Sequence, residues 1–131
     1  MTKLEKLIKE QQDYANRMGG LYELREADET YNDLNRKQIA AFYEQYGSAY
    51  LGSINYYDEQ RERILAGTES IFKEYTTGQM VYNFGCAFCV PKRDIELEYL
   101  VRSYLESNDR KTIDRIFDRI KRLGGLTFTW Y

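Results

Sequence analysis

The sequence predicts an α+β fold that is mainly helical, with five or six helices and a small β element of two or three strands. Apolar residues recur at three- and four-residue steps over much of the chain, which is the spacing of an amphipathic helix. Glycines interrupt these stretches, and proline occurs only once, at Pro91. Two short runs at 79–90 and 126–131 are rich in aromatic and β-branched residues, which favours strands there.

Length and composition predict one domain that spans 1–131. A chain of this size buries enough surface to fold without a disulfide or a metal. Charged residues make up 31% of the chain, but the net charge is only −2, as in an ordinary folded protein. No run approaches the roughly 20 apolar residues of a membrane span, and the charged N-terminus does not resemble a signal peptide. We therefore expect a cytoplasmic protein whose two cysteines stay reduced.

The first half of the chain is expected to be helical. A capping box of Thr2 and Glu5 begins the first helix, and Gly19 and Gly20 end it. Helical spacing continues on both sides of Gly47. The expected helices span 3–18, 21–46 and 48–67. One long kinked helix over 21–66 fits the same spacing, so both alternatives remain open.

The second half is expected to alternate between helices and strands. Asp94 is a candidate N-cap of the fifth helix, and Ser107 or Asn108 of the sixth, which ends at Gly124. A short fourth helix is expected over 68–78. The run at 79–90 is a strand or a buried helix, and as a strand it is expected to pair with 126–131. The clearest apolar stripe belongs to the sixth helix and is expected to lie in the core: Ile113, Ile116, Phe117 and Ile120.

The chain contains no histidine. Histidine is the usual general base near neutral pH and the commonest metal ligand. Its absence excludes a Ser-His-Asp triad, a Cys-His dyad and a His-containing zinc or iron site within one chain. No phosphate-binding glycine motif is present either. These observations predict a protein that is not an enzyme and needs no cofactor.

Cys86 and Cys89 form a C-x-x-C motif. This spacing suits a redox disulfide or half of a zinc site, and a thiol redox or metal-binding protein is one alternative function. Any further metal ligands would have to be carboxylates or come from a second subunit. The other interpretation is that both cysteines are small buried apolar side chains.

A strongly acidic stretch lies between residues 23 and 33, where Arg25 is the single basic residue. It is a candidate for docking on a basic surface, including a nucleic-acid channel. A solvated helix face is the alternative. The acidic candidates are Glu23, Glu26, Asp28, Glu29 and Asp33.

The last helix is basic, with six basic and three acidic residues between Asp109 and Arg122. Such a face can bind phosphates, so a nucleic-acid-associated regulator is another alternative function. The alternation of Asp114 and Asp118 with arginines is equally typical of ion pairs on a solvated helix. The candidates for a nucleic-acid face are Arg110, Lys111, Arg115, Arg119 and Arg122.

Five of the thirteen tyrosines cluster within residues 43–57. Tyrosine combines a large contact area with a polar tip and is enriched at protein interfaces. A helix has only one buried face, so we expect part of this cluster to meet a partner. The candidates are Tyr43, Tyr46, Tyr50, Tyr56 and Tyr57.

The leading hypothesis from the sequence is a non-enzymatic protein that binds and blocks a larger macromolecule. Its partner would be a protein, or a protein–nucleic-acid complex, with a basic surface. A small acidic chain rich in tyrosine suits an accessory protein of a phage or mobile element that inhibits a host defence nuclease, in the manner of an anti-CRISPR protein.

Overall fold

A computed structural model describes residues 1–24, 28–76 and 86–131. Over these residues the chain forms five α-helices, one short 3₁₀ helix and a four-stranded antiparallel sheet. The mainly helical α+β prediction is confirmed, but the sheet is larger than the two or three strands expected. The helices are α1 (Lys3–Arg17), η1 (Leu21–Glu23), α2 (Glu29–Tyr46), α3 (Asp58–Leu65), α4 (Ile95–Ser107) and α5 (Arg110–Arg122). The strands are β1 (Ala49–Gly52), β2 (Lys73–Tyr75), β3 (Phe88–Val90) and β4 (Leu126–Thr127).

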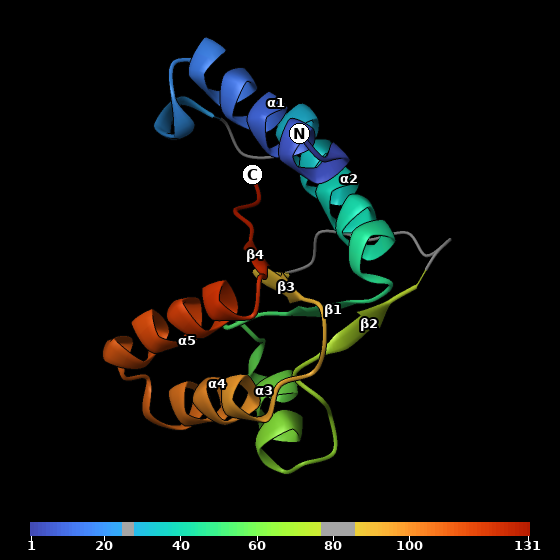
Figure 1. Ribbon diagram of the computed structural model, residues 1–131. Helices are drawn as coiled ribbons and strands as arrows, with labels where there is room; N and C mark the ends of the chain where they lie inside the picture. The colour runs from blue at the N-terminus through green and yellow to red at the C-terminus, as the bar shows by residue number, and fades with distance from the viewer. Residues whose placement is uncertain (25–27, 77–85) are drawn as a thin grey trace.

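The sheet lies between two groups of helices (Figure 1). Its strand order is β2-β1-β3-β4, and every neighbouring pair is antiparallel. The α1–α2 hairpin packs on one face, where Ala49 and Cys89 contact Leu4 and Phe42. Helices α3, α4 and α5 cover the other face. Side chains of a strand alternate between the two faces of the sheet. Phe88 and Val90 therefore point to the face covered by α3, α4 and α5, and Cys89 points to the face covered by the α1–α2 hairpin.

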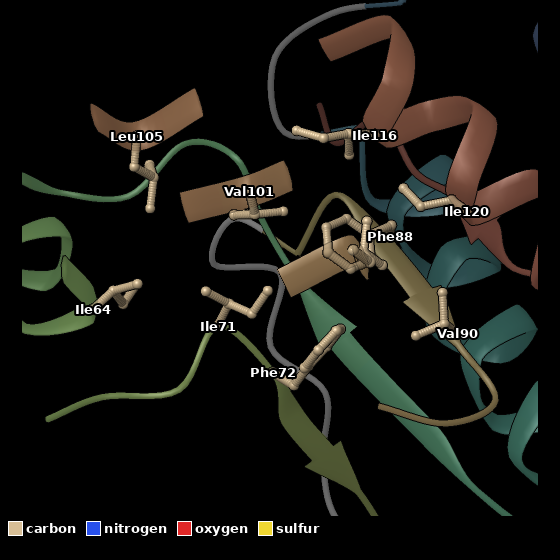
Figure 2. Close-up of a cluster of buried hydrophobic side chains, with 10 residues drawn as sticks. Ile64, Ile71, Phe72, Phe88, Val90, Val101, Leu105, Ile116 and Ile120 are labelled. Atoms are coloured by element: carbon tan, nitrogen blue, oxygen red, sulfur yellow. The ribbon is translucent and has the colours of Figure 1, made fainter. Parts of the chain in front are cut away.

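The main core lies between the sheet and helices α3, α4 and α5. Figure 2 shows its apolar side chains pointing toward one another from these elements. Phe88, Val101 and Ile116 are fully buried within it. The complete cluster consists of Ile64, Ile71, Phe72, Phe88, Val90, Leu97, Val101, Leu105, Ile116 and Ile120.

Two of the expected helices are wrong over most of their length. The segment expected as a helix over 48–67 forms β1, a connection and the shorter α3. The segment expected over 68–78 contains β2, and its last two residues lie outside the described part of the chain. Strand β1 packs on both faces and lacks the alternation of polar and apolar residues that would reveal it, whereas β2 is a mostly exposed strand of three residues. At Gly52 the Phe88 ring takes the place of a side chain, since a Cβ there would lie 2.3 Å from a ring carbon.

Capping residues predicted the ends of the helices better than apolar spacing predicted the segments 48–67 and 68–78. The Thr2–Glu5 capping box is present, and Asp94 caps α4 by accepting from the Leu97 N–H at 2.9 Å. The cap of α5 is Asp109 rather than Ser107 or Asn108. Asn108 instead ends α4 in the left-handed conformation, at φ 54°. The stretch 21–46 is not one helix, because η1 and α2 are separate elements.

The expected pairing of the two apolar runs is confirmed where the structure describes them. Cys89 pairs with Leu126 and Phe88 with Thr127. Residues 79–85 of the first run lie outside the described residues. In the second run only Leu126–Thr127 is a strand. Within the described ranges, no helix has the length and apolar character needed to cross a bilayer.

Candidate protein-binding groove

An open groove of about 820 Å³ is lined by residues of α1, η1, α2 and α5 and by residues 125–127. Helices α1 and α5 lie on either side of β4 (Figure 1). The apolar lining of the groove includes Ile8 from α1, Leu21 from η1 and Ile120 from α5. Amide side chains line the α1 and α2 side, and Asp118 and Lys121 lie on the α5 side. The remaining lining residues are Gln11, Gln12, Ala15, Asn16, Tyr31, Gln38, Phe117, Gly125, Leu126 and Thr127.

Phe117 lies in this groove and not in the core, which corrects the prediction from the apolar stripe. The residues that α5 buries are Thr112, Ile116 and Ile120. Phe117 is turned about 100° from Ile116 around the helix, and 37% of its surface is exposed. Ile113 is half-buried. The groove therefore gains an aromatic side chain that the protein covers only in part.

Buried amide side chains connect the two helices of the α1–α2 hairpin. Gln11 Nε2 donates to Asn35 Oδ1 at 2.7 Å and to the Tyr31 carbonyl at 3.1 Å. Gln38 Nε2 donates to Gln11 Oε1 at 2.9 Å. Because each buried amide has a partner here, the wall of the groove is a set of oriented hydrogen-bonding groups.

The same row of amides holds the extended segment that follows β4. Asn35 Nδ2 donates to the Thr129 carbonyl at 2.8 Å. Asn32 accepts from the Tyr131 N–H at 2.9 Å and donates to the Tyr131 carbonyl. The Tyr131 ring packs edge-on against Tyr31, with the ring centroids 5.0 Å apart. Side chains of α2 thus bind an extended backbone much as a neighbouring strand would.

No family model matches this chain, and neither the curated proteins nor the solved structures gave a match.

Most of the acidic candidates have partners within the protein. Asp28 caps α2 by accepting from the Tyr31 N–H at 2.9 Å, and it also accepts from the Tyr14 hydroxyl at 3.0 Å. Two surface ion pairs join Glu29 to Arg36 at 4.0 Å and Asp33 to Lys37 at 3.3 Å. Glu23 is exposed in η1, and Glu26 lies outside the described residues.

The basic candidates divide into one structural arginine and an exposed set. Arg119 Nε and Nη2 each donate to Asp94 at 2.8 Å, and Nη1 lies 3.2 Å from Glu96. The hydrogen bonds from Arg119 hold the pKa of Asp94 below its usual range. The exposed basic residues of α5 are Arg110, Lys111, Arg115, Lys121 and Arg122.

The tyrosine candidates do not form one surface. Tyr50 and Tyr56 pack against the main core, whereas Tyr43 packs on the opposite face of the sheet. The Tyr56 hydroxyl donates to the Ile71 carbonyl at 2.9 Å, and burial raises its pKa to about 12. Tyr46 is 44% exposed and Tyr57 is 76% exposed.

Both cysteines are buried. Cys89 packs beneath the α1–α2 hairpin, and the Cys86 carbonyl accepts from Trp130 Nε1. Burial raises the pKa of Cys86 to about 12 and also raises the pKa of Cys89, so both remain protonated thiols. This state favours the packing interpretation, because the thiolate is the form that attacks disulfides and binds metals. The described residues contain no group of three or more His, Cys, Asp or Glu placed to hold a metal.

The amides that line the groove are not among the site residues predicted from the sequence. Gln11 lies on the same helical stripe as Leu4, Ile8 and Ala15, which is an unusual place for a polar residue. Gln38 likewise interrupts the buried face of α2. A polar side chain on a buried stripe requires a hydrogen-bond partner, and that requirement was the available signal.

Proposed function

We propose that this protein acts without catalysis, by binding another protein in the groove between α1 and α5. The observation that carries the proposal is Phe117. It is a large aromatic side chain left partly exposed inside a groove that also contains Ile8, Leu21 and Ile120. Exposed aromatic anchors in apolar concavities are typical of binding hot spots.

Binding of this kind would suit an inhibitor that blocks a surface of a larger macromolecule. An accessory protein of a phage or mobile element that inhibits a host nuclease would act in this way. The acidic segment supports this proposal only weakly, because Asp28 is used as a cap and Glu29 and Asp33 are paired with neighbours. We therefore assign the main contact to the groove.

The test compares two aspartate substitutions by affinity capture from cells of the native host. Phe117→Asp places a charge in the groove. Tyr99→Asp is the matched control, because Tyr99 is 69% exposed on α4, away from the groove. We expect the Phe117 variant to capture at least about tenfold less of the partner than the wild type, as for a hot-spot residue. The Tyr99 control is expected to capture as much as the wild type. Equal retention by both folded variants would show that the groove is not the binding site.

A further inference from the structure

The outer edge of β4 carries backbone groups that the sheet does not use. Phe128 N–H donates to the Ala87 carbonyl at 2.7 Å, and Leu126 pairs directly with Cys89. In an antiparallel ladder, successive residues alternate between facing the partner strand and facing away from it. Leu126 and Phe128 face β3, so the N–H and C=O of Thr127 point to the opposite side.

This outer edge is covered along only part of its length. Beyond β4, Asn35 and Asn32 bind the outward groups of Thr129 and Tyr131. Thr127 is the outward-facing residue that precedes Thr129 along the strand, and it lines the groove. Among the described residues, no side chain reaches its outward N–H and C=O as the two asparagines reach Thr129 and Tyr131. The groove is therefore where the sheet edge remains available.

We propose that the groove accepts an extended segment of a partner protein, which adds to β4 as a fifth strand. This inference rests on the proposed function and specifies the form of the partner. The Thr127 N–H and C=O would bond to the backbone of the added strand, as in β-augmentation. Successive side chains of the added strand would then point alternately toward Ile8 on the α1 side and Phe117 on the α5 side of the groove.

The charges beside the groove favour a neutral or acidic segment. Helix α5 carries five exposed cations against the two exposed carboxylates of Asp114 and Asp118. Lys121 and Asp118 both lie in the wall of the groove, so the positive balance belongs to α5 as a whole. A segment that carries carboxylates would be attracted to this helix, and a basic one would be repelled. The row of amides that already binds an extended backbone continues into the groove through Gln11 and Gln38.

Thr127→Pro is the variant that tests strand addition. Proline removes the N–H of residue 127, but that N–H points away from β3, so the existing ladder keeps its bonds. Thr127→Ser is the matched control, since it shortens the side chain and leaves the backbone donor in place. Thermal unfolding of both variants checks that the fold is retained.

The probe is a library of short random peptides displayed on phage and selected against the wild-type protein. Enriched peptides are synthesised, and their affinities are measured for the wild type, both Thr127 variants and Phe117→Asp. We expect the enriched sequences to contain apolar residues together with acidic ones, and few basic residues. We expect Thr127→Pro to weaken binding by about tenfold, while Thr127→Ser binds like the wild type. Every second N–H of the bound peptide would face β4. Methylating that set of peptide nitrogens should abolish binding, whereas methylating the other set should not, and the protein is unchanged in both cases.

The outcomes separate this inference from the proposed function. Peptides that bind Thr127→Pro as well as the wild type, but lose affinity for Phe117→Asp, would overturn strand addition and leave the groove as a binding site. Peptides unaffected by Phe117→Asp, or no enrichment at all, would overturn both proposals. A labelled single-stranded oligonucleotide that binds in the groove while no peptide does would also overturn both.

Discussion

Asp94 stabilises two helices at once. It caps α4 through the Leu97 N–H and accepts two hydrogen bonds from Arg119 of α5. Its carboxylate therefore holds together two elements that cover the same face of the sheet. Arg119 is the arginine of α5 that binds Asp94. Because its guanidinium is used in this internal contact, Arg119 is not part of a binding face.

We predict that Asp94 makes the stability depend on pH under acidic conditions. Its pKa is lowered in the folded state, chiefly by the hydrogen bonds from Arg119. The unfolded chain therefore binds the proton more readily, so this stabilisation is complete above the ordinary aspartate pKa of about 3.9. It is lost as the pH falls through the lower, folded-state pKa.

The measurement is the free energy of unfolding of the wild type and of Asp94→Asn between neutral pH and about pH 2. Asparagine retains a capping oxygen but not the negative charge. We expect the wild type to be the more stable protein at neutral pH and the difference to shrink in acid. A difference that stays constant with pH would show that the charge of Asp94 contributes nothing.

At the scale of elements, α5 shows how neighbouring apolar residues take different roles. Ile116 is fully buried, whereas Phe117 is partly exposed in the groove. The direction of each side chain around the helix decides between core and surface, and hydrophobicity alone does not. We predict that Ile116→Ala lowers the free energy of unfolding by about 2–5 kcal/mol. For Phe117→Ala we expect a smaller loss of about 1–2 kcal/mol, because part of its surface is already in water.

Urea denaturation of the two alanine variants gives both values under the same conditions. The two residues are adjacent on one helix, so each substitution serves as the control for the other. If Phe117→Ala proved as costly as Ile116→Ala, Phe117 would belong to the core and the groove would lose its anchor.

At the scale of the whole molecule, the surface charges separate the protein-binding proposal from a nucleic-acid role. The protein has a net charge of −2, and Asp114 and Asp118 lie among the exposed cations of α5. We predict that short labelled DNA binds with a dissociation constant weaker than about 10⁻⁴ M at physiological salt. Fluorescence anisotropy at two salt concentrations measures this.

The control for the DNA measurement is Arg115→Glu combined with Arg122→Glu, which leaves Arg119 and its contacts with Asp94 in place. Tighter binding by the wild type that weakens steeply with salt and disappears in the double variant would favour a nucleic-acid-associated regulator. In that case the groove would be secondary to the exposed face of α5.

Elements with local signals could be predicted from the sequence. The capping residues Thr2 and Asp94 mark the starts of α1 and α4. The short strands β1 and β2 have no comparable signal. Strand β1 packs against side chains on both faces of the sheet, so polar and apolar residues do not alternate along it. Strand β2 is a three-residue edge strand with Lys73 and Glu74 exposed. Their helical spacing is accidental, and pairing with distant strands decides their conformation.

The sequence by itself determined the helical character of the chain and excluded any site that needs a histidine of this chain. It predicted that 79–90 pairs with 126–131 if the first run is a strand, and the structure decided that point. Only the tertiary structure decided which charged residues are used internally and where the groove lies. The groove is lined by residues that lie far apart in the chain, such as Ile8 and Ile120. Local propensities act over a few residues, whereas the position of such residues follows from the packing of the whole chain.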